Sequence, residues 1–146
     1  MPLEVRPARV EDAELCASFT ATGRDAEAFR AAFASDKEVW VVMSSESEGA
    51  IFGVAGCQLW RWNKVAWVMD LSVRRDRRGH GQGRVLLDAL IAAAQRQGAL
   101  VLMDFEPQGG QLIEFYLQNN FRICGFNDRY LPGTDDPSVV FLSRDL

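Results

Sequence analysis

The stretch that decides the fold is Val65-Ala-Trp-Val-Met-Asp-Leu-Ser-Val73, continued by Arg74-Arg-Asp-Arg-Arg-Gly-His-Gly-Gln-Gly83 and Arg84-Val-Leu-Leu-Asp-Ala-Leu-Ile91. The first part is almost continuously apolar, which predicts a strand buried on both faces. The glycines of the second part permit positive φ angles and leave the backbone unshielded by side chains. The third part carries one apolar helical face, made by Leu86, Leu87, Leu90, Ile91 and Ala94. The stretch therefore predicts a strand, a glycine-rich turn and a helix.

The turn and the helix start together predict an anion site. The first N–H groups of a helix lack partners and carry partial positive charge. A glycine turn lets a phosphate approach them closely. Arginines of the same turn add charge-assisted hydrogen bonds, and they are Arg74, Arg75, Arg77 and Arg78. The glycines alone would also suit a tight turn with a solvated basic rim, but the flanking strand and helix favour the phosphate interpretation.

Two common phosphate loops do not fit this turn. A Walker A loop requires Gly-Lys followed by Ser or Thr, and this turn lacks that sequence. The dinucleotide fingerprint G-x-G-x-x-G would require a third glycine at Arg84 or at Leu86. The spacing that is present is Arg78-x-x-Gly81-x-Gly83.

This spacing resembles the pyrophosphate loop of the GNAT superfamily of acyl-CoA-dependent N-acyltransferases, and Leu71-Ser-Val73 resembles its central strand. The resemblance is specific from Val65 to about Phe121 and is strongest to acetyltransferases of ribosomal-protein N-terminal amines. It implies acetyl-CoA as acyl donor and no metal. It also implies that backbone groups at Leu71, Ser72 and Val73, where the central strands splay apart, bind the pantetheine arm. The implied pyrophosphate ligands are Arg78, Gly79, His80, Gly81, Gln82, Gly83 and Arg84.

The resemblance also implies a catalytic acid, Tyr116. The segment Phe115–Phe121 resembles the family's Tyr-x-x-x-Gly-Phe sequence, whose tyrosine protonates the departing thiolate. Asn120 replaces the glycine, and asparagine tolerates the left-handed conformation. A phenol with a pKa near 10 suits a thiol leaving group. The alternative is that Tyr116 only packs, since Leu112 and Ile113 share its helical face.

Three carboxylates are candidates for the general base. Asp104 ranks first because it precedes Tyr116 by twelve residues, where the ribosomal-protein acetyltransferases carry a glutamate. An aspartate is one carbon shorter, so a bridging water is expected. Glu106 ranks second because strand alternation places it on the same side. Asp70 ranks third, and its apolar surroundings equally suit a buried structural hydrogen bond.

One departure from the family concerns the last helix. Many members carry an asparagine that contacts the cofactor seven residues before the tyrosine, where this chain has Gly109. Gln111 or backbone amides are the candidates to replace that contact, and Tyr116 completes the expected cofactor contacts.

The remaining chain predicts the other elements of an α+β fold. Strands are expected at 3–7, 38–43, 51–59, 65–73, 99–105, 121–126 and 138–143, and helices near 11–23, 25–34, 83–98 and 111–119. We expect a single GNAT-like domain over 1–146, with a mixed, mostly antiparallel central sheet and helices on both faces. Gly53 and Gly56 mark bulges or close approaches. Trp60 and Trp62 are expected to pack across the strands rather than to be exposed at the hairpin tip.

Composition excludes several function classes. A net charge of −4 gives a nucleic-acid partner no electrostatic support. Cys16, Cys57 and Cys124 are odd in number and widely spaced, against a disulfide framework or a zinc site. The single histidine, His80, argues against a histidine metal centre. Neither a signal peptide nor an apolar run of about 18 residues is present, so we expect a cytoplasmic protein without a membrane.

We therefore expect an acetyl-CoA-dependent N-acetyltransferase that acts by direct transfer in a ternary complex. One alternative is a non-catalytic acyl-CoA-binding sensor, and a second is a nucleotide- or dinucleotide-binding protein. The acceptor is a small-molecule or peptide amine of unspecified kind. Strand ends near the C-terminus are compatible with a homodimer.

Overall fold

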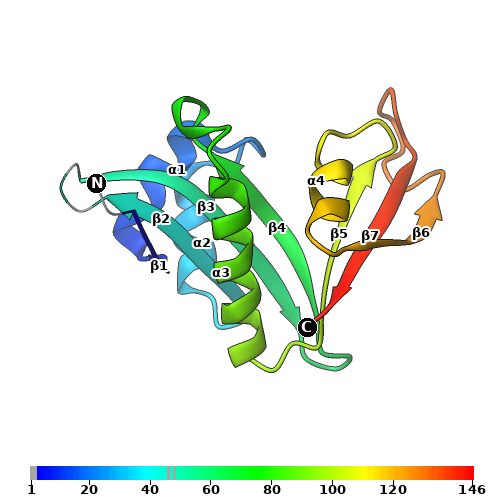
Figure 1. Ribbon diagram of the computed structural model, residues 1–146, viewed down its shortest axis with the longest axis horizontal. Helices are drawn as coiled ribbons and strands as arrows, with labels where there is room; N and C mark the ends of the chain where they lie inside the picture. Colours follow the sequence, from blue (N-terminus) through cyan, green and yellow to red (C-terminus); the bar gives the residue numbers. More distant parts are fainter. Residues whose placement is uncertain (1–2, 46, 48) are drawn as a thin grey trace.

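The computed structural model describes residues 3–45, 47 and 49–146 of the chain. Within these residues seven strands form one sheet in the order β1-β2-β3-β4-β5-β7-β6 (Figure 1). The strands are β1 (Glu4–Pro7), β2 (Glu38–Ser45), β3 (Ala50–Trp60), β4 (Val65–Val73), β5 (Val101–Pro107), β6 (Arg122–Asn127) and β7 (Val139–Asp145). The helices are η1 (Val10–Asp12), α1 (Ala13–Phe19), α2 (Ala26–Ala34), η2 (Arg75–Arg77), α3 (Gln82–Arg96) and α4 (Leu112–Gln118). The predicted order of elements is confirmed.

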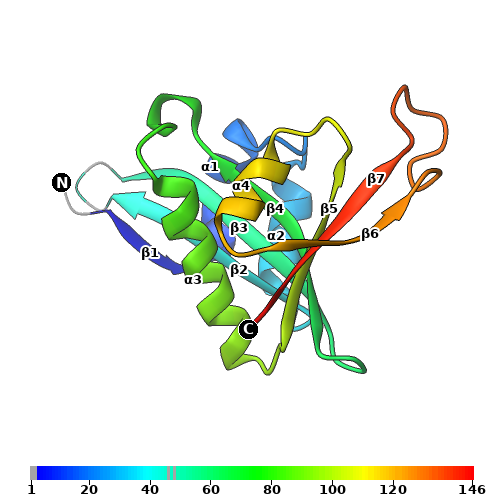
Figure 2. The same ribbon diagram turned by 45° about the vertical axis from the view of Figure 1, so that its right-hand side comes forward.

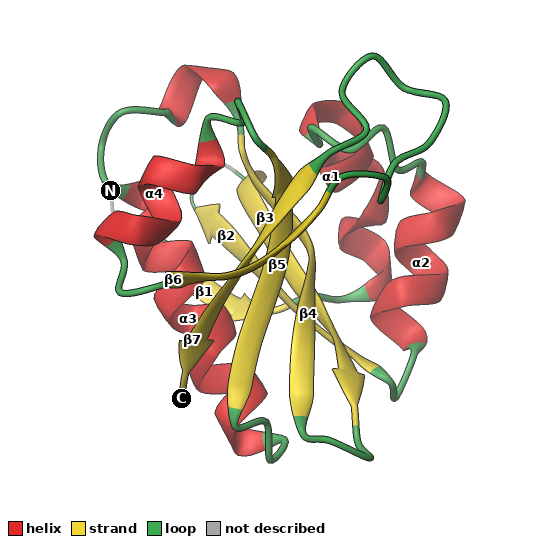
Figure 3. Ribbon diagram, turned by 90° about the vertical axis from the view of Figure 1, so that its right-hand side faces the viewer, coloured by secondary structure: helices red, strands yellow, loops and turns green. Residues whose placement is uncertain are grey.

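The helices cover both faces of the sheet, as predicted. Figure 3 shows α1 and α2 on one face and α3 and α4 on the other. The strand pairs are antiparallel except β4 and β5, which run parallel because α3 carries the chain back between them. Asp25 caps α2 by accepting a hydrogen bond of 2.8 Å from the Ala28 N–H. Gly98, at φ 91°, lets the chain leave α3.

Two hydrophobic cores hold these layers together. One lies between α3 and the sheet and includes Leu86, Leu90 and Leu102. The other lies under α1 and α2 and includes Phe29 and Trp40. Gly56 was predicted to allow a close approach, and a Cβ there would collide with the Trp40 indole. The register of β3 against β4 also shifts after Gly56, so the predicted bulge is confirmed.

The sheet is divided between β4 and β5. The two strands pair only over Val65–Trp67 and Val101–Met103 and then diverge. Figures 1 and 2 show the resulting V, with α4, β5, β6 and β7 on one arm. The divergence begins before Leu71, earlier than the family resemblance implied. It also corrects the prediction that β4 is buried on both faces, because only Ala66, Asp70 and Ser72 of this strand are buried.

Of Trp60 and Trp62, which were both predicted to pack across the strands of the β3–β4 hairpin, only Trp60 does so. Trp60 packs across the strands on Trp67, with 5.5 Å between ring centroids. Trp62 is 83% exposed, so the prediction that it packs was wrong. The turn at 61–64 places this side chain beyond the last strand pair, where no neighbouring strand remains to receive it.

The structure also shows the environment of each cysteine. All three cysteines are free; Cys16 and Cys57 are buried and Cys124 is exposed. Burial raises the pKa of both buried thiols to about 12. Among the described residues, no helix is long and apolar enough to cross a membrane. The same residues contain no cluster of His, Cys, Asp or Glu suited to a metal ion.

Candidate active site

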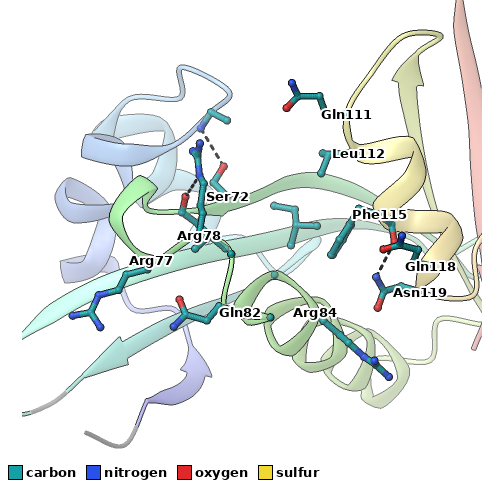
Figure 4. Close-up of a pocket in the computed structure, with 16 residues that line it drawn as sticks. Ser72, Arg77, Arg78, Gln82, Arg84, Gln111, Leu112, Phe115, Gln118 and Asn119 are labelled. Carbon is teal, nitrogen blue, oxygen red and sulfur yellow. Dashed lines mark hydrogen bonds between the residues drawn. The ribbon is translucent and has the colours of Figure 1, made fainter.

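A cavity of about 600 Å³ lies beside the divergence of β4 and β5. The end of β4, the glycine-rich turn, the start of α3 and one face of α4 enclose it (Figure 4). Its lining residues outside α4 are Ala21, Leu71, Ser72, Val73, Arg77, Arg78, Gly79, Gly81, Gln82, Gly83, Arg84 and Gln111. From α4 and its end come Leu112, Phe115, Gln118 and Asn119.

The glycine-rich turn presents backbone donors to this cavity. Gly79 and Gly81 have φ angles of 84° and 74°, in the left-handed region that glycine adopts without strain. Gly81 is the N-cap residue of the 15-residue helix α3, and no side chain caps that helix. The first amides of α3 therefore keep their hydrogen-bonding capacity at the positive end of the helix dipole. This donor set fits a pyrophosphate group.

Arg78 stiffens the turn. Its Nε donates a hydrogen bond of 2.9 Å to the Val73 carbonyl oxygen, which ties the turn back to the end of β4. In Figure 4 the Arg78 side chain lies beside Ser72, whereas the Arg77 guanidinium points away from both. Arg77 lies over the Phe52 ring at 4.0 Å from its centroid. Both arginines line the cavity, and Arg78 is the one whose side chain lies beside Ser72 there.

Gly83, at the start of α3, lies close to Phe115 of α4 on the opposite wall of the cavity. A Cβ added to Gly83 would lie 3.4 Å from the Phe115 ring. This is an ordinary van der Waals distance, so Gly83 and Phe115 are neighbours across the cavity. Both residues line the cavity.

A hydrogen-bonded cluster fixes the α1–α2 connection to β4. Asp70 is buried, and its carboxylate accepts hydrogen bonds from Thr20 at 2.6 Å, Thr22 at 3.1 Å and Ser72 at 2.5 Å. Ser72 Oγ in turn accepts a hydrogen bond of 3.1 Å from the Ala21 N–H (Figure 4). Asp70 is therefore fully partnered, which favours the structural alternative for this residue over a role as base.

Tyr116 and Asp104 form a buried pair on the other arm of the V. The Tyr116 hydroxyl donates a hydrogen bond of 2.6 Å to Asp104 Oδ2. The Phe105 N–H donates to Asp104 Oδ1 at 2.8 Å. Tyr116 is fully buried, and Asp104 is 9% exposed. Sequence reasoning placed the two residues twelve positions apart without predicting that they touch.

The environment of this pair shifts both pKa values upward. Burial is the main cause that raises the pKa of Asp104 to about 7, and the negative charge of Glu106 adds to it. The hydrogen bond from Tyr116 acts in the opposite direction. Burial, followed by the charge of Asp104, raises the pKa of Tyr116 well above its ordinary value. Burial also raises the pKa of Glu106. Asp104 is thus a carboxyl group poised to change protonation near neutral pH.

The predicted site residues divide into two groups. Most of the expected cofactor ligands line the cavity, including Gln111 but not Gly109. His80 does not line it, and its Nδ1 lies 2.9 Å from the Arg78 carbonyl oxygen. The four catalytic candidates, Tyr116, Asp104, Glu106 and Asp70, also lie outside the cavity lining.

Sequence reasoning missed the contribution of α4 to the cavity wall. Phe115, Gln118 and Asn119 follow Gln111 at intervals of four, three and one residues along a helix. Spacings of this kind place residues on one helical face, and that signal was available in the sequence. Asn120 has φ 68°, which confirms the left-handed turn predicted after this helix.

Comparison with known proteins decides the family. Residues 8–121 of the sequence match the acetyltransferase (GNAT) family. The chain belongs to the GNAT acetyltransferase family. Proteins of this family are acyl-CoA-dependent N-acetyltransferases that act on amines, so the chain is an enzyme that uses acetyl-CoA. No curated protein sequence matches the chain.

Solved structures share the fold of this GNAT chain at low sequence identity. Nourseothricin acetyltransferase is 20% identical, with 99% of each chain covered and a TM-score of 0.79. The ribosomal-protein-S18-alanine N-acetyltransferase from Escherichia coli is 17% identical, with 99% of this chain and 94% of that chain covered and a TM-score of 0.82. The PaiA N-acetyltransferase from Thermoplasma acidophilum, in complex with coenzyme A, is 14% identical over 100% of both chains, with a TM-score of 0.79. These likenesses establish the fold.

Proposed function

We propose that this chain transfers the acetyl group of acetyl-CoA to a primary amine by direct attack in a ternary complex. The observation that carries the proposal is the Tyr116–Asp104 hydrogen bond of 2.6 Å. It lies on the arm of the V that faces the uncapped start of α3. An acid and a base are therefore held together across the gap from a set of anion-binding amides.

The residues that line the cavity divide the binding of the acyl donor between them. The α3 amides and Arg78 would hold the pyrophosphate, and the backbone at Leu71–Val73 would hold the pantetheine arm. Bound acetyl-CoA supplies a thioester carbonyl as the electrophile. Phe115 and Leu112 provide an apolar wall that excludes water from this side.

Asp104 is proposed as the general base. An ammonium group must lose a proton before its nitrogen can attack, and a carboxylate with a pKa of about 7 accepts that proton near neutral pH. The short side chain reaches the amine through a water. Glu106, whose negative charge raises the pKa of Asp104, strengthens this base without replacing it.

Tyr116 is proposed as the general acid. When the C–N bond forms and the C–S bond breaks, the Tyr116 hydroxyl gives its proton to the sulfur. Part of the barrier to tyrosinate formation is the charge of Asp104, and that charge is gone once Asp104 has taken the amine proton. The Asp104 proton then returns along the 2.6 Å hydrogen bond to Tyr116. After attack the nitrogen still carries one surplus proton, which leaves to solvent as the amide forms. An ammonium and acetyl-CoA thus give the amide, CoA thiol and one released proton, and Asp104 and Tyr116 return to their starting states.

The first experiment is thermal unfolding with acetyl-CoA, CoA, NADPH and ATP in parallel. A ligand at about 100 times its Kd stabilises the folded chain by roughly 2.7 kcal/mol. That corresponds to a shift of several degrees in Tm. We expect the shift with acetyl-CoA and CoA. A shift with NADPH or ATP alone would support the nucleotide-binding alternative instead.

The second experiment separates an enzyme from an acyl-CoA sensor. We expect CoA release on addition of an amine, with kcat/KM falling as pH drops below about 7, where Asp104 becomes protonated. The double variant Tyr116→Phe with Asp104→Asn should lose turnover and keep the Tm shift with CoA. Asp88→Asn, an exposed carboxylate on α3, is the matched control. Equal turnover in the double variant would contradict these catalytic roles.

A further inference from the structure

One face of the sheet carries five aromatic rings that belong to neither hydrophobic core. They are Trp60, Trp67, Phe105, Tyr130 and Phe141, here called the aromatic face. The ring centroids form a continuous chain: Trp60–Trp67 5.5 Å, Trp67–Phe141 6.1 Å, Phe141–Tyr130 5.3 Å and Tyr130–Phe105 4.7 Å. Trp60 is 39% exposed and Tyr130 is 40% exposed. A contiguous aromatic patch of this kind on a folded chain is typical of a binding surface.

The aromatic face lies at the reaction gap. Trp67 and Met103 form the last paired position before β4 and β5 diverge. Phe105 follows Asp104 directly, and its N–H bonds the Asp104 carboxylate at 2.8 Å. Because neighbouring residues of a strand point to opposite faces, Asp104 turns toward α4 and Phe105 turns away from it. The aromatic face therefore lies on the opposite side of β5 from Asp104 and Tyr116, and Trp67 brings it to the point where β4 and β5 diverge.

Because the acyl donor has a cavity of its own, the aromatic face remains available to bind the amine. The cavity that suits the acyl donor is walled mainly by α3, α4 and the end of β4, and Ala21 of the α1–α2 connection also lines it. In a ternary complex the amine must reach the gap while that cavity is filled, so it approaches from the other face. The β6–β7 connection contributes Tyr130, whose ring closes over Phe105 and Phe141 on this approach.

One polar atom of the aromatic face is unsatisfied. The Trp67 indole Nε1 is buried and has no hydrogen-bond partner among the residues that the structure describes. By contrast, the Trp60 Nε1 donates to Gln58 at 3.1 Å. Neither indole N–H is therefore offered to a ligand, so these two residues present ring faces rather than hydrogen-bond donors.

We propose that the aromatic face binds the acceptor and selects amines that carry a flat aromatic group close to the primary amino group. This inference rests on the proposed function. Aromatic rings stack on aromatic rings, and an ammonium over a ring face gains a cation–π interaction. An amino sugar or a linear polyamine would leave the rings incompletely covered and its own polar groups unpaired. An arylalkylamine matches the surface in shape and in charge.

The test compares acceptors of different chemistry with the intact chain and saturating acetyl-CoA. The acceptors are phenethylamine, tryptamine, ethanolamine, spermidine and a short peptide with a free N-terminal alanine. We expect kcat/KM for the two aromatic amines to exceed that for the others by tenfold or more. Equal or better turnover of ethanolamine, spermidine or the peptide would overturn the inference and leave the acetyltransferase proposal standing.

Variants then locate the preference on the aromatic face. Tyr130→Ala should raise the KM for phenethylamine about tenfold, with kcat and the KM for acetyl-CoA within twofold of the parent. Trp67→Leu tests the second ring, and Trp62→Ala, at the exposed hairpin tip, is the matched control. An unchanged KM in Tyr130→Ala contradicts the inference. If the parent chain sediments as a dimer and Tyr130→Ala sediments as a monomer, a second copy of the chain covers the aromatic face. That outcome also overturns the inference.

A binding measurement keeps the inference testable if turnover is absent. Phenethylamine is titrated into the chain with CoA present while tryptophan fluorescence is followed. A saturable change in the parent and in Trp62→Phe, lost in Trp67→Phe, supports the aromatic face even if the proposed chemistry fails. No saturable change in the parent overturns the inference by itself.

Discussion

At the scale of single residues, the pair of Tyr116 and Asp104 concentrates the chemistry of this chain. Two titratable groups with raised pKa values share one buried hydrogen bond. Neither group titrates independently, because the protonation of one changes the charge felt by the other. Changes in the protonation of this pair should therefore alter the free energy of unfolding as well as the rate of turnover.

Asp104 makes the free energy of unfolding depend on pH. Its pKa is about 7 in the folded chain against an ordinary value of 3.8, so between these values the folded state binds more protons than the unfolded state. The unfolding free energy contributed by this group consequently falls as pH rises through that window. In Asp104→Asn we expect the decline between pH 4 and pH 7 to be shallower by about 2–4 kcal/mol, measured by urea denaturation at several pH values.

Glu106 and Asp12 also make the free energy of unfolding depend on pH, so they contribute to the result of this experiment. Burial raises the pKa of Glu106, so a smaller decline in the same direction remains in Asp104→Asn. Asp12 behaves oppositely: burial raises its pKa, but the hydrogen bonds from Arg6 and the Arg9 N–H, together with the charges of both arginines, lower it by more. The stabilisation from Asp12 is therefore lost only as pH falls below about 4. Asp88→Asn is the control, and an equally steep decline in Asp104→Asn and in this control would contradict the assignment.

At the scale of elements, the start of α3 is tested through its positive-φ glycine. Gly81 has φ 74°, and a Cβ there meets open space, so Gly81→Ala adds backbone strain of about 1–2 kcal/mol without a clash. We expect this strain to distort the turn and to weaken acetyl-CoA binding, measured by titration calorimetry. Gly98→Ala, with φ 91° at the far end of the same helix and equally open, should cost similar stability and leave binding unchanged. If Gly81→Ala and Gly98→Ala lose the same affinity for acetyl-CoA, the glycine-rich turn has no specific role in binding it.

The α1–α2 connection is tested through its anchor on β4. Thr20→Val removes the 2.6 Å hydrogen bond to Asp70 and leaves a buried carboxylate with one donor fewer. We expect a stability loss of about 1–3 kcal/mol and a raised KM for acetyl-CoA, since Ala21 of this connection lines the cavity and then moves relative to β4. Thr134→Val removes an exposed hydroxyl that donates to the Leu131 carbonyl at 2.8 Å and should change neither quantity. A Thr20 variant with parent-like stability would show that Asp70 does not anchor this connection.

Much of this element-scale organisation was predictable from sequence. The order of helices and strands follows from periodicity, and the turn at Asn120 follows from its residue type. Contacts between distant elements were not predictable, because they depend on how helices sit on the sheet. The contact of Tyr116 with Asp104 and the point where β4 leaves β5 are of this kind. Trp62 was mispredicted because residue type alone does not say where a strand pair ends.

At the scale of the whole molecule, one contact joins the outer helices to the middle of the sheet. Gly56 lies against the Trp40 indole, which Phe29 and Phe33 hold from the other side at centroid distances of 5.7 and 5.6 Å. Because Trp40 has no room to retreat, we expect Gly56→Ala to destabilise the fold by about 1–3 kcal/mol in urea denaturation. Gly109→Ala, where a Cβ meets open space, is the matched control. If Gly56→Ala and Gly109→Ala unfold at the same urea concentration, the core repacks around Trp40 without a loss of stability, which contradicts this prediction.

The distribution of thiols through the molecule has a practical consequence for the bench. Cys16 and Cys57 are sealed in separate cores with pKa values of about 12, so aqueous disulfide reagents meet almost no thiolate at either position. Cys124 stands exposed on the edge strand β6. A colorimetric assay that counts released coenzyme thiol will therefore start from a background of one equivalent per native chain. The same sulfur offers a single attachment point for a fluorophore or an immobilising linker, on the arm of the V away from the glycine-rich turn.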